Sequence, residues 1–148
     1  MHSKLREEII NLSESDQWDF AKFEWNFEFA YYANEPQNCL CGHYPMRNIC
    51  VIKKHKNSIV TEVGNCCINK FLGIDDGNKI FSSIKKLKDD IKGSMSAEVI
   101  DYLHRKNGIS DFDYKFYKSI YRKRILSAKQ WKIKEQINRK FLNFTSYV

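Results

Sequence analysis

The chain has 148 residues, enough for one compact domain or for a small module with an extension, and too few for two large independent domains. Hydrophobic residues make up 43% of it and aromatic residues 14%, which is sufficient for a core and excludes a wholly disordered protein. The net charge of +7 is unevenly distributed. Residues 1–78 hold 8 Lys/Arg and 11 Asp/Glu, a charge of about −3, whereas residues 79–148 hold 17 Lys/Arg and 7 Asp/Glu, a charge of about +10. The basic half favours a polyanionic partner, although a solvated lysine-rich surface has the same composition.

Membrane and secretory segments are not apparent in the sequence. No apolar run approaches the roughly 20 residues that span a bilayer, and residues 1–11 lack the apolar stretch of a secretory signal. Five cysteines, an odd number clustered between Cys39 and Cys67, do not resemble the disulfide framework of a secreted domain. We therefore expect an intracellular protein that does not bind a membrane.

The N-terminal half reads as a short helix followed by strands. Residues 3–11 have helical apolar spacing, and residues 18–21 fit a helical turn. Between Phe23 and Tyr31 aromatic residues occupy every second position, which predicts a strand that ends at residues 34–38. Residues 47–54 and 58–63 predict a hairpin. Asn65 then fits the N-cap of a helix through Phe71 and Leu72 that Gly73 ends.

The C-terminal half reads as helices with recognisable caps. Asn78 fits the cap of a helix that ends at a left-handed Gly93, and Ser96 fits the cap of the next helix. The first of these helices has an apolar face formed by Ile80, Phe81, Ile84, Leu87 and Ile91. Ser110 with Asp113, and Ser127 with Gln130, are spaced as capping boxes for helices over 111–124 and 128–142. We predict an α+β protein with a zinc-bound module over 1–75 and a basic helical region over 76–148 packed on it as one unit.

A group of potential metal ligands lies within residues 38–72. Structural zinc is held by four thiolates or imidazoles, usually from a tight loop and a second site brought close by folding. Cys39-Leu-Cys41-Gly-His43 has the pattern of such a loop, in which Gly42 lets the backbone curl. The second site is the pair Cys66–Cys67 at a predicted strand-to-helix junction. This order of loop, hairpin and helix is treble-clef-like, and it predicts one structural zinc ion held by Cys39, Cys41, His43 and Cys67.

The assignment leaves alternatives open. Neighbouring side chains on a helix project about 100° apart, so Cys66 and Cys67 do not both reach one ion, and we favour Cys67. His43 follows Cys41 so closely that it can instead donate a hydrogen bond to a ligand or lie on the surface. Cys50 is expected in the core. Packing of the thiols without metal is one alternative, and a cysteine or zinc enzyme is another, although no nucleophile or deaminase motif supports it.

Residues 112–142 interleave aromatic and cationic side chains. On a helix, Phe112, Phe116 and Ile120 share a face that we assign to the core, while Tyr117 and Tyr121 lie on an adjacent stripe that can stack on bases or pack on the next helix. The last helix is expected to place Ile133, Ile137 and Phe141 on the core and a basic surface that includes Lys134 outside. Predicted phosphate contacts are Lys115, Lys118, Arg122, Lys123, Arg124, Lys129 and Lys132, with Tyr117, Tyr121 or Trp131 stacking on bases.

Two segments resemble known sequence patterns. Cys39-Leu-Cys-Gly-His43, the hairpin, and Val63-Gly-Asn-Cys-Cys67-Ile resemble a zinc-knuckle module of small uncharacterised proteins from phages, large DNA viruses and bacterial mobile elements, and Trp25 fits that pattern. Phe116 to Leu142, with Leu126-Ser-Ala-Lys-Gln130, resembles a second motif of phage-encoded proteins. The resemblance implies a zinc-stabilised accessory protein of viral or mobile-element origin, located in the cytoplasm or nucleus of the host cell.

Together these observations favour a zinc-stabilised protein that binds nucleic acid and is not an enzyme. The alternative is a protein-binding inhibitor or regulator of a host nucleic-acid machine. Such a protein would contact a host or viral partner through the acidic, aromatic N-terminal half or through the last helix.

Overall fold

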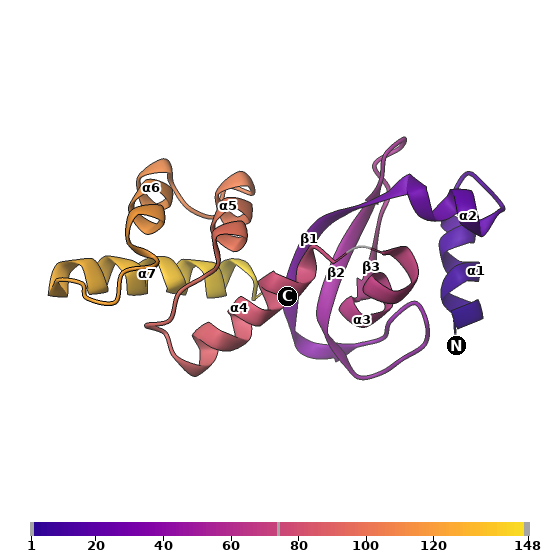
Figure 1. Ribbon diagram of the computed structural model, residues 1–148. Coiled ribbons are helices and arrows are strands. Elements are labelled where there is room, and N and C mark those ends of the chain that lie inside the picture. Colours follow the sequence, from indigo (N-terminus) through magenta and orange to yellow (C-terminus); the bar gives the residue numbers. More distant parts are fainter. Residues whose placement is uncertain (1, 74, 147–148) are drawn as a thin grey trace. The chain divides into compact units, whose positions relative to one another are not determined.

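The computed structural model describes the backbone of residues 2–73 and 75–146, and the side chains of residues 4–70, 73 and 75–146. The chain forms two compact units, of which unit 1 ends at Asn78 and unit 2 begins at Lys79. Unit 1 contains a three-stranded antiparallel sheet with helical segments, and unit 2 is helical (Figure 1). The α+β class agrees with the prediction. No helix within the described ranges is long and apolar enough to cross a membrane.

Unit 1 begins with helix α1 (His2–Leu12), in which Leu5 and Ile9 are fully buried one turn apart. The Ser13 hydroxyl donates to the Ile9 carbonyl at 2.5 Å and accepts from the Trp25 indole at 2.9 Å, so it joins the end of α1 to the start of the sheet. Helix α2 (Trp18–Ala21) and the 3₁₀ turn η1 (Lys22–Glu24) lie between them. The strand therefore begins at Trp25, and the prediction that it begins at Phe23 is wrong; the Phe23 side chain is 72% exposed.

Strands β1 (Trp25–Gln37), β2 (Met46–Lys54) and β3 (Val60–Gly64) pair in that order. The predicted hairpin is confirmed as β2 and β3. Cys50 pairs with Ala30 on one side and Val63 on the other, so small, buried side chains form a row across the sheet. β1 continues through Pro36, where a break was predicted; a proline is tolerated there because β1 is an edge strand.

A single helical turn, α3 (Asn65–Cys67), follows β3 and continues as the π-helical segment η2 (Ile68–Leu72). The N-cap residue is Gly64, so the prediction that Asn65 caps this helix is wrong. The Asn65 amide instead donates to Asn78 Oδ1 at 2.9 Å, and its oxygen accepts from the Cys50 thiol at 3.4 Å. Gly73 ends the segment, as predicted, and its backbone is left-handed. The predicted core positions Phe71 and Leu72 lie outside the described side chains.

The boundary between the units lies inside the first turn of α4 (Gly77–Asp89). In its described residues, unit 2 contains the rest of α4 and the helices α5 (Ala97–Arg105), α6 (Asp111–Ile120) and α7 (Ala128–Phe144). The predicted apolar face of α4 is buried at Ile80, Phe81, Ile84 and Leu87. The helix ends at Asp89 rather than near Gly93, which closes a turn by donating to the Asp90 carbonyl and is not left-handed.

The predicted caps of unit 2 are largely confirmed. Ser96 caps α5, and Ser127 forms a reciprocal capping box with Gln130 at the start of α7. Ser110 accepts from the Asp113 backbone, but the Asp113 carboxylate binds Lys140 at 2.6 Å instead of returning to the cap. Helix α6 ends at Ile120, four residues before the predicted end, so residues 121–127 form the connection to α7.

The buried face of α6 differs from the predicted one. Phe112 is 66% exposed, whereas Tyr117 and Ile120 are buried. The Tyr117 hydroxyl donates to Asn138 Oδ1 at 2.7 Å and accepts from the Met95 amide at 2.9 Å. Asn138 in turn donates to the Ile91 and Gly93 carbonyls, at 2.7 and 2.9 Å. Tyr117 thus connects α6, α7 and residues 91–95, and it does not stack on a base.

Candidate metal centre

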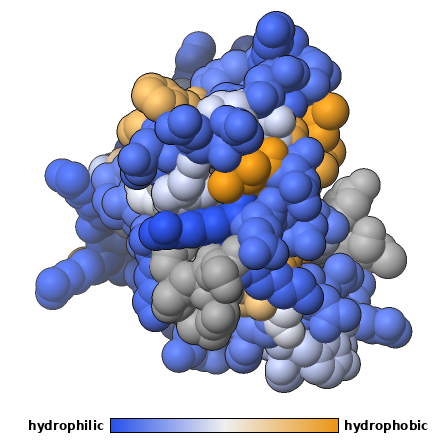
Figure 2. Space-filling model, turned by 90° about the vertical axis from the view of Figure 1, so that its right-hand side faces the viewer, coloured by the Kyte–Doolittle hydropathy of each residue, from blue (hydrophilic) through white to orange (hydrophobic). Residues whose placement is uncertain are grey.

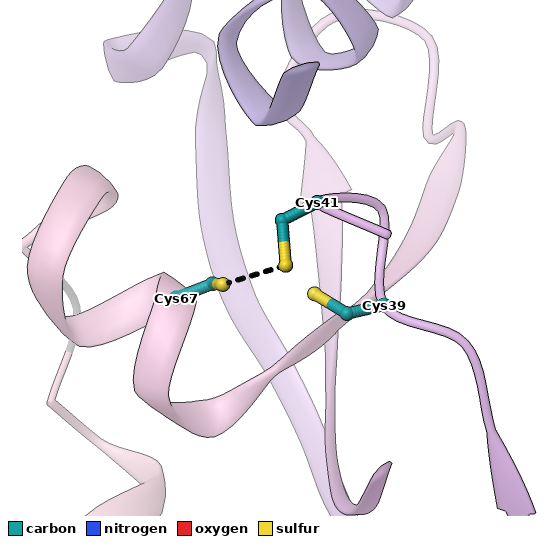
Figure 3. A group of neighbouring side chains, drawn as sticks. All are labelled: Cys39, Cys41 and Cys67. Atoms are coloured by element: carbon teal, nitrogen blue, oxygen red, sulfur yellow. Dashed lines mark hydrogen bonds between the residues drawn. The ribbon is translucent and has the colours of Figure 1, made fainter. Parts of the chain in front are cut away.

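Three thiols from two distant segments meet in unit 1. The Sγ atoms of Cys39, Cys41 and Cys67 all lie within 4.8 Å of one another, and those of Cys41 and Cys67 are 3.3 Å apart (Figure 3). Cys39 and Cys41 precede β2, whereas Cys67 lies in α3 directly after β3, so the hairpin brings the segments together. Cys66 is exposed and does not belong to this group, in agreement with the preference for Cys67.

The loop that carries Cys39 and Cys41 is curled as the sequence predicts. Gly42 has a φ of +92°, which glycine adopts without a steric penalty. Its amide donates to the Cys39 carbonyl at 2.9 Å, and the Cys39 amide donates to the His43 carbonyl at 3.0 Å. The two thiols therefore turn toward the same side of the loop.

Backbone amides also approach the sulfur atoms directly. The Gly64 amide donates to Cys39 Sγ at 3.3 Å. A Cβ at Gly64 would lie 2.7 Å from Met46 Sδ and 3.5 Å from Cys39 Sγ, so only glycine lets the end of β3 approach this closely. Amide donors of this kind stabilise a thiolate more than a thiol.

The thiols influence one another's ionisation. Burial opposes ionisation of Cys41, but hydrogen bonds from the His43 backbone and from the other two thiols outweigh it, so the pKa of Cys41 lies below its usual value. Burial, followed by the hydrogen bond to Cys41 and the charge of Cys39, raises the pKa of Cys67 well above its usual value. Burial also raises the pKa of Cys50 to about 12, which fits a neutral core thiol rather than a ligand.

The donor set fits a soft or borderline divalent cation. Zn–S bonds of about 2.3 Å at tetrahedral angles put sulfur atoms about 3.8 Å apart. The separation of 3.3 Å between Cys41 and Cys67, and the limit of 4.8 Å for the whole group, lie on either side of that value. Three cysteines can therefore hold a metal ion here after small side-chain adjustments.

A pocket of about 690 Å³ opens beside the thiols and is also lined by His43 and Cys66. The His43 side chain is exposed and is not part of the group of close ligand atoms, so its contact with the centre is made through its backbone. Its role as the fourth ligand stays a prediction.

The predicted phosphate contacts differ in their exposure. Lys118 and Tyr121 are half-buried, and Lys118 binds Asp101 at 3.2 Å. The other predicted residues are exposed: Lys115, Arg122, Lys123, Arg124, Lys129 and Lys132. These six cations have no carboxylate within 4 Å among the residues that the structure describes.

Sequence reasoning missed the position of Lys134. The sequence predicts it on the basic outer surface of α7, but it is 2% exposed. The buried residues of α7 are Lys134, Ile137, Asn138 and Phe141. Their spacing of three, one and three places them on one helical stripe, so the periodicity could have found this lysine if polar residues had been allowed in the core.

No family model, curated protein or solved structure matches the chain.

Proposed function

We propose that the protein is a metal-stabilised nucleic-acid-binding protein, in which one zinc ion holds the treble-clef-like part of unit 1 and unit 2 contacts phosphates. The observation that carries the proposal is the set of exposed, unpaired cations around the α6–α7 connection. Cations without carboxylate partners are available to replace the counterions of a polyanion.

Arg122, Lys123 and Arg124 lie in residues 121–127, where the chain has left α6 and not yet entered α7. All three are exposed, and the Arg122 guanidinium lies 5.4 Å from the centre of the Tyr121 ring. This cation–π contact restrains Arg122 while its guanidinium stays exposed, which suits contact with a phosphate or a base. The adjacent Ile125 is 91% exposed, so the tip of this connection is free for contact.

The start of α7 supports the same interpretation. Its first turn contains Lys129 and no acidic residue, and Lys132 follows three residues later. The N-terminus of a helix carries positive potential, so cations there reduce helix stability by about 0.3–1 kcal/mol. An arrangement that costs stability is better explained by an anionic ligand than by folding.

Zinc has a structural role in this proposal. Cys39, Cys41 and Cys67 supply three ligands, and His43, which lines the same pocket, supplies the fourth after a change of side-chain rotamer. The ion would neutralise the thiolates and fasten α3 to the loop before β2.

The test is the salt dependence of binding to single- and double-stranded oligonucleotides. We expect simultaneous change of Arg122, Lys123 and Arg124 to alanine to reduce the slope of log K against log salt by about 2 to 3, because each phosphate contact contributes about 0.7–0.9. The control is the triple alanine variant of Lys22, Lys53 and Lys56 in unit 1, which removes the same charge. An equal decrease of the slope in both variants, or no binding of oligonucleotides by the wild-type protein at low salt, would contradict the proposal.

A second candidate, a protein-binding regulator, is favoured by exposed apolar side chains in unit 1. These are Phe20, Phe23, Ile59 and Val60, which are 43–72% exposed. Figure 2, however, shows a mainly hydrophilic face with apolar patches that are small and separate. Co-purification of a stoichiometric protein partner after nuclease treatment, lost in Phe20→Ser and Phe23→Ser, would favour this function over the first.

A further inference from the structure

Unit 2 contains a pocket of about 340 Å³ between α4 and the segment that leads into α5. Its walls are Lys79, Ser82, Ser83 and Lys86 from α4 and Ser94, Met95 and Ser96 before α5. The four α4 residues are spaced by three, one and three, so they share one side of the helix. The walls carry four hydroxyl groups and two amines but no carboxylate.

Ser83 is the first sign that this pocket takes a ligand. Ser83 is only 6% exposed, yet its hydroxyl has no hydrogen-bond partner among the described residues. The hydroxyl is not sealed inside the protein either, since Ser83 lines the pocket. A hydroxyl at a pocket wall with no protein partner can donate a hydrogen bond to an acceptor that enters the pocket.

Lys134 is the second sign. It is 2% exposed, and its ammonium donates one hydrogen bond, of 2.6 Å, to the hydroxyl of Ser94 in the pocket wall. No carboxylate lies within 4 Å of it in the part of the chain that the structure describes. Burial and the charge of Lys86 lower the pKa of Lys134, with only Asp90 acting in the opposite direction. The Trp131 ring, whose centre lies 5.0 Å from the Lys134 ammonium, is a cation–π partner, but it carries no negative charge to balance the lysine.

We propose that this pocket binds a phosphate group, which the Ser83 and Ser94 hydroxyls and the Lys86 amine contact, while Lys134 supplies charge from behind Ser94. Lys79, now 2.7 Å from Glu98 in an exposed ion pair, can turn to the same anion at little cost. Ser96 caps α5, so the N-terminus of that nine-residue helix adds positive potential at the pocket. Inorganic phosphate, a phosphomonoester and a nucleic-acid phosphodiester share this chemistry.

This site shares no residue with the metal centre or with the α6–α7 cations. Phosphate binding can therefore hold even if the proposed function fails, and the two are tested by different variants.

The experiment is an NMR titration of the full-length protein with inorganic phosphate, with chloride at equal ionic strength as the reference. We expect saturable shifts of the amides of residues 94–96 and an increase in the Tm of unit 2 of about 4 °C or more at saturation. Lys86→Ala should raise the Kd for phosphate at least 10-fold, and Ser83→Ala should raise it at least 3-fold. Lys85→Ala, the neighbouring exposed lysine outside the pocket, should leave the Kd unchanged. Equal effects of Lys85→Ala and Lys86→Ala, or shifts that chloride reproduces, would overturn the proposal.

Lys134→Met distinguishes a binding role from a structural one, because methionine retains the packing and removes the buried charge. We expect a folded protein with equal or higher Tm and at least 10-fold weaker phosphate binding. Unchanged phosphate affinity in a folded Lys134→Met protein would overturn the assignment of the buried charge to this site.

The source of the phosphate is identified with one oligonucleotide, prepared with and without a 5′-phosphate. Shifts at residues 94–96 with only the phosphorylated form identify a monoester, whereas shifts with both forms identify the nucleic-acid backbone. If neither form nor inorganic phosphate shifts these amides, there is no phosphate site. The Arg122–Arg124 triple variant should leave inorganic phosphate binding intact.

Discussion

Replacing Tyr117 by phenylalanine tests whether one hydroxyl holds unit 2 together. The residue is 0% exposed, and its hydroxyl satisfies both Asn138 Oδ1, at 2.7 Å, and the Met95 amide, at 2.9 Å. The substitution keeps the ring and leaves both partners buried without a hydrogen bond. Each such group costs about 1–3 kcal/mol, so we expect the free energy of unfolding of unit 2 to fall by about 2 to 6 kcal/mol.

The assay is urea unfolding monitored by amide hydrogen exchange. Peptides from residues 79–146 report on unit 2 alone, so its unfolding is measured separately from that of unit 1. Tyr114→Phe is the control, since its hydroxyl binds Asp101 at 2.8 Å on a half-exposed surface and should contribute much less to stability than the Tyr117 hydroxyl. The amide of Met95 should also lose protection in Tyr117→Phe. A loss below 1 kcal/mol, or equal losses in the two variants, would refute the reasoning.

Three further predictions follow from single contacts. Gly64→Ala should lower both the metal affinity and the stability of unit 1, measured by zinc competition and thermal unfolding, because its Cβ would meet Met46 Sδ at 2.7 Å. Ser127→Ala should cost unit 2 about 1 kcal/mol in urea unfolding, because it removes the capping box of α7. Unit 2 should lose stability between pH 10 and 12, because burial raises the pKa of Tyr117 to about 12 while the unfolded tyrosine ionises near 10; the loss should be smaller in Tyr117→Phe.

The elements with strong local signals could be predicted from the sequence. Ser96 and Ser127 act through contacts three residues away, and Gly73 is recognised because it provides a left-handed end, so their roles depend on nearby chain alone. The β2–β3 hairpin is equally local. The meeting of Cys39, Cys41 and Cys67 was predictable for the same reason, because a hairpin necessarily returns the chain to its start.

The errors arose where tertiary contacts decide. Phe112 and Phe116 have the spacing of a core face, yet Tyr117 is buried instead because Asn138 and Met95 pair with its hydroxyl. Lys134 is buried because Ser94, forty residues earlier, accepts its hydrogen bond. Neither partner can be recognised from sequence periodicity, which counts polarity along one helix only.

The metal content of the purified protein tests the central claim most directly. We predict one equivalent of zinc in the wild-type protein, retained in Cys66→Ser and lost in Cys67→Ser, with loss of structure confined to unit 1. Cys66 is exposed and outside the thiol group, so it is the matched control for Cys67. A folded, metal-free wild-type protein, or equal zinc content in the two variants, would contradict the account.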